Sequence, residues 1–185
     1  MGATDGNGFV NPVGRVGNCC NCCGGQQATG QVVDGNIFGP TVAYNMASLR
    51  DGTSNIIIVG EHSDFIWDAA GTKTVQVSGT HGILMGGDQL LRIRDRPISS
   101  GHNWGRQFNM TTVRFPPNAR VVNNDPAWPG VGDNYGSNNP LNSAHPGGVQ
   151  VLMGDDVVKF VSENIDMLTF RRALTRDDGQ PVGQF

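Results

Sequence analysis

The stretch SAHPGGVQVLMGDDVVKFVSENID, residues 143–166, decides the fold. It holds two apolar runs, residues 149–154 and 157–162, which are joined at Gly154-Asp155-Asp156. Glycine and aspartate are typical turn residues, and HPGG provides a second turn before the first run. The pattern therefore predicts a β-hairpin.

Two polar residues of this stretch, His145 and Asp155, are ten positions apart. Because an extended strand rises about 3.3 Å per residue, they would lie roughly 30 Å apart at opposite ends of the first strand. Such a separation does not suit a catalytic dyad or a shared metal ion. We interpret both as turn-shaping residues of the hairpin.

Further short β-type runs surround the hairpin, and most are flanked by Gly, Asn, Asp or Pro. They cover residues 36–39, 55–62, 73–79, 82–87 and 111–115. Residues 164–176 predict a helix with Asn164 or Asp166 as its cap and arginines near its end, and residues 41–49 are a second helix candidate. The pattern predicts an α+β, β-rich antiparallel sheet domain with one or two short helices.

The composition bounds the function. The chain has 185 residues, 27 of them Gly, and a formal net charge of -3, so no basic surface is available for a phosphate backbone. Nucleic acid is therefore not an expected partner, and no apolar run is long enough to span a bilayer. We expect one domain over residues 32–185, preceded by an extended Gly/Asn-rich arm over residues 1–31.

All four cysteines fall in NCCNCC, residues 18–23. We expect an extracellular setting in which local disulfides staple this loop, with the pairing left open; a thiolate metal site is the alternative. The disulfide candidates are Cys19, Cys20, Cys22 and Cys23.

Other polar motifs can be interpreted either as turns or as functional sites. DGTSN, residues 51–55, has turn chemistry and leads into an apolar run; the alternative is that Asp51 joins Glu61 or Asp155 in a Ca²⁺ site. No other cofactor is expected. Asn109 starts an N-glycosylation pattern, NMT. No spacing of the four histidines matches a metal motif, and no nucleophile elbow, P-loop or dinucleotide fingerprint is present.

Four blocks together resemble a known family. They are DGTSNIIIVGE, FNMTTVRFPPN, the 143–166 stretch and RRALTRDDGQPVGQF. In this order they are similar to the bacterial, chiefly planctomycete, pilin-like family named for its H-x9-DG motif, the domain of unknown function 1559, over residues 33–185. The resemblance implies a pilin-like globular head, in which the motif residues are Asp51, Gly52, Thr53, Ser54, Asn55, Glu61, His145, Pro146, Gly147, Gly148, Asp155 and Asp156.

The chain departs from the family pattern at several positions. Asp156 replaces a Gly, Gln150 an Asn and Gln180 a Glu, and the prepilin-type cleavage site with its long apolar helix is not seen. Either that helix has been removed or this chain assembles differently.

The functional hypothesis is a non-catalytic, extracellular or cell-surface bacterial subunit that self-assembles into a pilus-like or other filament. The arm would insert into a neighbour's sheet through main-chain hydrogen bonds, with Phe9, Val10, Val13 and Val16 as its apolar side chains. The expected partner is thus another copy of the chain, with glycans as a further candidate.

Two other functions compete with this hypothesis. One is a secreted carbohydrate-binding or adhesive module that uses Trp67, Trp104, Trp128 and Tyr135 as stacking faces. The other is a hydrolase whose acid and base come from Asp51, Glu61, His145 or Asp155, which would need these groups to converge in a cleft.

Overall fold

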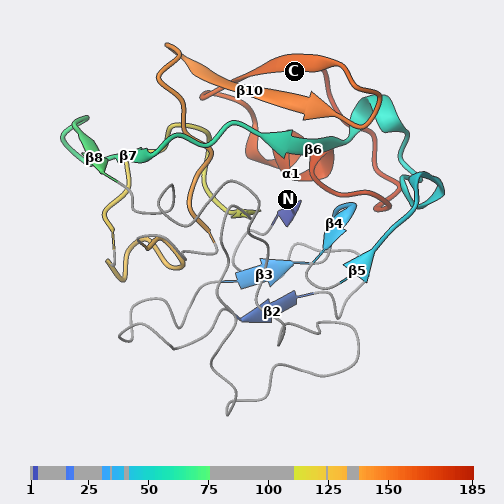
Figure 1. Ribbon diagram of the computed structural model, residues 1–185, viewed down its shortest axis with the longest axis horizontal. Coiled ribbons are helices and arrows are strands. Elements are labelled where there is room, and N and C mark those ends of the chain that lie inside the picture. The colour runs from blue at the N-terminus through green and yellow to red at the C-terminus, as the bar shows by residue number, and fades with distance from the viewer. Residues whose placement is uncertain are drawn as a thin grey trace.

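The computed structural model describes residues 2–3, 16–18, 31–33, 35–39, 42–75, 111–123, 125–132 and 138–185. Within these ranges the chain is α+β with strands dominant (Figure 1). The strands are β1 (Gly2–Ala3), β2 (Val16–Asn18), β3 (Gln31–Val33), β4 (Phe38–Gly39), β5 (Val42–Ala43), β6 (Ile57–Gly60), β7 (Phe65–Trp67), β8 (Lys73–Val75), β9 (Thr112–Val113), β10 (Gly148–Met153) and β11 (Val158–Ser162). The helices are α1 (Met167–Ala173) and the short 3-10 helices η2 (Met46–Ser48) and η3 (Thr53–Asn55).

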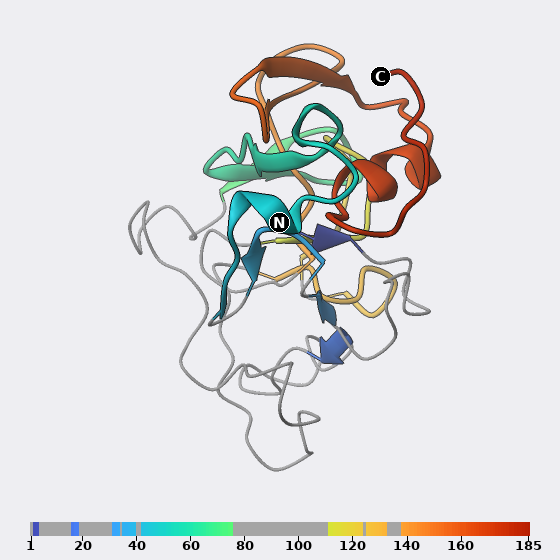
Figure 2. The same cartoon turned by 90° about the vertical axis from the view of Figure 1, so that its right-hand side faces the viewer.

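The central sheet has the order β11-β10-β6 and is antiparallel throughout. The predicted hairpin is confirmed: β10 pairs with β11 from Gly148↔Ser162 to Leu152↔Val158. The hairpin lies at the top of Figures 1 and 2, away from the smaller β2–β3 pair. The other antiparallel pairs are β2–β3, β4–β5 and β7–β8, and β1 pairs in parallel with β9.

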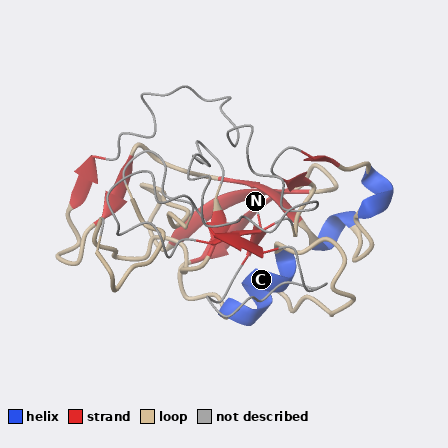
Figure 3. Ribbon diagram, turned by 90° about the horizontal axis from the view of Figure 1, so that it is seen from below, coloured by secondary structure: helices blue, strands red, loops and turns tan. Residues whose placement is uncertain are grey.

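The two faces of this sheet differ because side chains alternate along each strand. On the inner face, Val149, Val151, Met153 and Val161 are buried against Phe170, Ala173 and Leu174 of the α1 region. Ile57, Val113 and Leu141 complete this core, and Val182 and Phe185 of the C-terminal tail pack on it. Figure 3 shows the C-terminal end beside α1.

Helix α1 confirms the predicted helix and selects one of its two cap candidates. The Asp166 carboxylate accepts a hydrogen bond from the Thr169 amide at 2.7 Å, and Arg171 and Arg172 occupy the last turn. An acidic cap and basic last turn both suit the helix dipole. The other helix prediction, over residues 41–49, is wrong: the segment forms β5 and η2, because β4 pairs with β5.

Two smaller apolar clusters lie beside the main core. Ile37, Leu49 and Ile56 form one, with Tyr44 and Ile58 against it. In the other, Ile66, Val121 and Val131 pack with Phe115 and Trp128, whose rings meet edge to face at 5.2 Å. Part of the long Asn/Pro/Gly loop is therefore packed by its own aromatic residue.

Two short pieces of the predicted arm pair within the chain. Gly2 and Ala3 pair with β9, and Val16 pairs with Val33 in the β2–β3 ladder. Phe9, Val10, Val13 and all four cysteines lie outside the described residues, as do Asn109 and the predicted strand at 82–87. The division at residue 31 stays a prediction.

Candidate functional site

His145 and Asp155 stand on either side of β10. His145 precedes the strand in the HPGG turn, and Asp155 follows it in the turn to β11. The six residues of β10 separate them. His145 and Asp155 therefore act in different turns of the fold.

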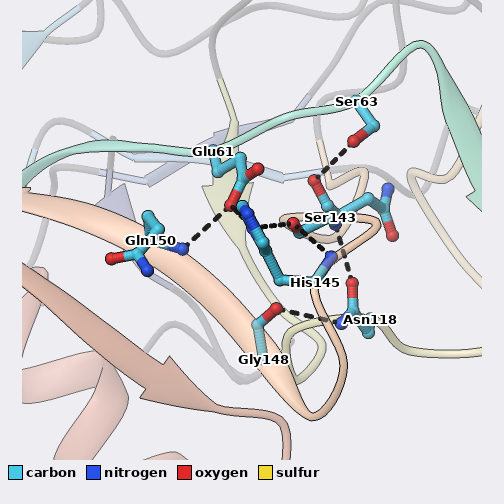
Figure 4. Close-up of polar contacts among 8 residues, drawn as sticks. Glu61, Ser63, Asn118, Ser143, His145, Gly148 and Gln150 are labelled. Atoms are coloured by element: carbon cyan, nitrogen blue, oxygen red, sulfur yellow. Dashed lines mark hydrogen bonds and ion pairs between the residues drawn. The ribbon is translucent and has the colours of Figure 1, made fainter.

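At the His145 end, a polar cluster joins the HPGG turn to the end of β6 (Figure 4). The Glu61 carboxylate Oε2 accepts the Gln150 amide at 3.0 Å and lies 3.2 Å from His145 Nδ1. Ser143 Oγ lies 2.7 Å from the same Nδ1 and accepts the His145 amide at 2.9 Å. Glu61 thus binds main chain and side chains from a segment more than eighty positions away.

This environment sets the charge of Glu61. Partial burial raises the pKa of the carboxyl, but hydrogen bonds from the Gln150 amide, Ser143 and His145 outweigh it, so the pKa is lowered overall. A negative charge is therefore held at this junction at neutral pH. The exposed His145 ring, 57% of whose side-chain surface is accessible, lies against it.

The cluster contains serine, histidine and glutamate, but not in the order of a catalytic triad. In a triad the nucleophile and the carboxylate bond to different ring nitrogens. Here both approach Nδ1, and Ser143 is fully buried. Its hydroxyl shapes the turn before His145, as serines commonly do.

Asn118 fastens the same turn from the other side. Its Oδ1 accepts the Ser143 amide at 2.8 Å, and its Nδ2 donates to the Gly148 carbonyl at 3.2 Å (Figure 4). Asn118 has a positive φ of 55°, which asparagine tolerates better than most residues. Sequence reasoning missed Asn118 and Ser143, although Asn after two prolines and Ser two positions before His were local turn signals.

Asp51 forms a second junction. Its Oδ2 and Oδ1 accept the amides of Asp178 and Gly179 at 2.8 and 3.0 Å. DGTSN is thereby joined to the closing block of the chain. Burial, and then the nearby Asp51 carboxylate, raises the pKa of Asp178, although a hydrogen bond from the Gln180 amide opposes the change.

The Asp155 end of the hairpin is a tight turn. The Asp155 carboxylate accepts the Val157 amide at 3.3 Å, and the Met153 amide donates to the Val157 carbonyl at 2.8 Å. Asp156 has a φ of 67°, in the left-handed region that favours glycine. The family pattern has Gly at this position, and Gly adopts this conformation without the strain that Asp156 has.

We expect Asp156→Gly to stabilise the chain. Relief of the left-handed strain should raise the free energy of unfolding by roughly 0.5–1 kcal/mol, within the range for such substitutions. Asp156→Val should lower it, because a β-branched residue tolerates this conformation poorly. Urea unfolding measures both, and equal stability of the two variants would contradict the turn geometry.

In the part of the chain that the structure describes, the carboxylates of the Ca²⁺ alternative do not form a metal-binding group. There, no three His, Cys, Asp or Glu side chains gather closely enough to hold a metal ion. Asp51 and Glu61 instead each bind two groups of the protein's own chain, and Asp155 caps its turn. Asp51, Glu61 and Asp155 therefore do not form one site.

The described aromatic residues of the carbohydrate-binding alternative are packed within the fold. Trp67 meets Phe65 edge to face at 5.1 Å, with the Lys73 ammonium 5.3 Å from its ring centroid. Trp128 packs on Phe115. Trp104 and Tyr135 lie outside the described residues.

Fold and site together define an α+β domain in which two motif carboxylates, Asp51 and Glu61, bind distant segments of the same chain. The chain belongs to the family described as protein of unknown function DUF1559, whose model matches residues 21–168. The match starts before residue 33 and ends within α1, so it does not include the closing block. No curated protein and no solved structure matches the chain. In the described ranges, no helix has the length and hydropathy needed to cross a membrane.

The burial of His62, which follows Glu61 after β6, and the hydrogen bonds of Glu61 predict a fall in stability with acidification. Burial lowers the pKa of His62 below its usual 6.5, and the pKa of Glu61 lies below its usual 4.5. For both groups the unfolded chain takes up the proton first, so the free energy of unfolding decreases as the pH falls. The His62 contribution declines below about pH 6.5, and the Glu61 contribution below about pH 4.5.

Urea midpoints at several pH values test this dependence. His62→Gln should flatten the change between pH 7 and 5, whereas Glu61→Gln should flatten only the change below pH 4.5. Asp178, whose pKa is raised, acts in the opposite sense, so single-site variants are needed. Unchanged slopes in both variants would contradict the assignment.

Proposed function

We propose that the protein is a non-catalytic structural subunit that assembles with copies of itself outside the bacterial cell, as a pilus-like or other surface filament. One observation carries the proposal: the motif carboxylates Asp51 and Glu61 bind main-chain amides of the same chain. Groups used in this way stabilise a fold. Membership of the family is consistent with a structural role, and the clustered cysteines suit an extracellular setting.

The arm provides the means of assembly in this proposal. Its described pieces, β1 and β2, are short strands that bind β9 and β3 by main-chain pairing. Exchange of such strands between copies would preserve the same hydrogen bonds while linking subunits. Because each subunit would donate one arm and receive another, the contact is head-to-tail and extends into a filament.

Electron microscopy of the purified full chain, with analytical ultracentrifugation, tests the proposal. We expect filaments from the full chain and monomers from a chain that lacks residues 1–31. Circular dichroism and urea unfolding test whether the shortened chain is folded. Uniform monomers of the full chain at all concentrations, or identical filaments from the shortened chain, would overturn the proposal.

A further inference from the structure

The outer edge of β11 has the features of a strand that pairs with another chain. The Met153 amide donates to the Val157 carbonyl, and the Glu163 amide donates to the Gly147 carbonyl. Because antiparallel residues alternate in the direction of their main-chain groups, odd-numbered residues of β11 face β10. The main-chain N–H and C=O groups of the even-numbered residues therefore point outward, at Val158, Phe160 and Ser162.

Most of these outward groups have no hydrogen-bond partner within the described ranges. There, β11 pairs only with β10, and no described residue hydrogen bonds to the outward groups of Val158 or Phe160. The Ser162 carbonyl accepts the Ile165 amide at 3.1 Å. By contrast, at the other edge of the sheet, the buried Asn36 donates its side-chain amide to the Ile57 carbonyl of β6 at 2.7 Å.

Three apolar side chains on the outer face of the sheet are exposed. Val158 is 63% exposed, Phe160 44% and Val59 48%, and Leu152 lies between Val158 and Val59 in register. The polar side chains on this face are Gln150 and Ser162, and Glu61 lies beside Gln150 at the end of β6. An unpaired edge beside an exposed apolar face favours strand addition.

The overlap of the strand with itself, together with its charges, favours a second copy of β11 as the occupant. In a two-fold antiparallel pairing centred on Phe160, the two copies of Phe160 lie opposite each other and Val158 lies opposite Ser162 of the second copy. Every residue of β11 then has a partner in the β11 strand of the second copy. Lys159 then lies opposite Val161 and diagonal to Glu163 of the second copy, within reach of a long side chain. A register centred on Lys159 would instead place the two lysines directly opposite each other.

We propose that two copies of the chain associate through β11, which joins their three-stranded sheets into one continuous sheet. The contact is isologous, because the same strand serves on both sides. The inference rests on the self-association proposed above and adds a contact separate from the arm. Because one strand edge buries much less than the roughly 1,200–2,000 Å² of a stable interface, the pair is weak alone and strengthens when the arm also links the subunits.

A cysteine at position 160 tests the register in the full chain. Directly opposed residues have Cα atoms about 5.5 Å apart, which suits a disulfide. We expect Phe160→Cys to yield a disulfide-linked pair of peptides that each contain position 160, identified by non-reducing mass spectrometry. The peptide assignment separates this link from the four native cysteines.

Ser162→Cys is the matched control, because the two copies of position 162 would lie roughly 13 Å apart. Equal self-linking at 162 and 160, or none at 160, would overturn the β11 contact. Val158→Pro gives a second test: it removes an outward amide without disturbing the β10 ladder, so the population of β11-linked pairs should be lost while the fold remains. Unchanged association of a folded Val158→Pro chain would also overturn it.

The assembly through the arm and the contact through β11 can be refuted independently. Filaments that form without a 160–160 link would contradict the β11 contact but agree with assembly through the arm. A 160–160 link in a chain that forms only dimers would support the β11 contact and contradict the proposed filament. Each outcome therefore identifies which contact is wrong.

Discussion

Gly148→Ala is expected to lower the free energy of unfolding by about 3 kcal/mol or more, beyond most overpacking substitutions. A Cβ atom at this position would collide with the Val161 main-chain carbonyl and would lie 2.7 Å from the Phe160 ring. A flexible side chain could move aside, but the carbonyl belongs to the β10–β11 ladder. The two strands would have to separate at the start of the hairpin.

Gly147→Ala is the matched control within the same HPGG motif. Gly147 has a φ of 81°, but nothing lies within 4 Å of its added Cβ. Only backbone strain of about 1–2 kcal/mol is expected. Thermal or urea unfolding that ranks Gly147→Ala as the more damaging variant would contradict the packing of the hairpin.

Asn36→Ala is expected to have a comparable effect, about 3–5 kcal/mol, because several buried main-chain groups lose their partner together. The side-chain Nδ2 donates to the Ile57 and Leu174 carbonyls at 2.7 and 2.9 Å, and Oδ1 accepts the Ile37 amide. Asn36 therefore links the β6 edge to the end of α1. Loss of all three bonds should loosen both.

Asn45→Ala provides the comparison for Asn36. Asn45 is exposed, and its side chain contacts Ser48 Oγ at 3.0 Å. Its replacement should change the free energy of unfolding by no more than about 0.5 kcal/mol. Similar urea midpoints for the Asn36 and Asn45 variants would show that the buried bonds do not stabilise the fold.

The hairpin and α1 were predictable because their signals are local. Alternation, a Gly-Asp-Asp turn and an aspartate cap each lie within a few residues of the element that they define. The strand at 65–67 was missed because its apolar run is short. It is supported by pairing with β8 and by Lys73 over the Phe65 ring, which involve residues outside the run.

The junctions were not predictable from local patterns. Asp51 and Glu61 were singled out as family motif residues, but their partners at Asp178, Gly179 and Gln150 are fixed only by the folded chain. Asn36 gave no signal at all, since a single asparagine before an apolar run is typical of a turn. Long-range hydrogen bonds of this kind appear only once the tertiary arrangement is known.

The motif carboxylates Asp51 and Glu61 bind the protein's own main chain. Amide hydrogen exchange on the full chain tests this binding most directly, by comparing the native protein with Glu61→Ala and Asp51→Ala. We predict protection of the Gln150, Asp178 and Gly179 amides, with loss at Gln150 in the Glu61 variant and at Asp178 and Gly179 in the Asp51 variant. Exchange of these three amides at the rate of open loops in the native protein would contradict the account.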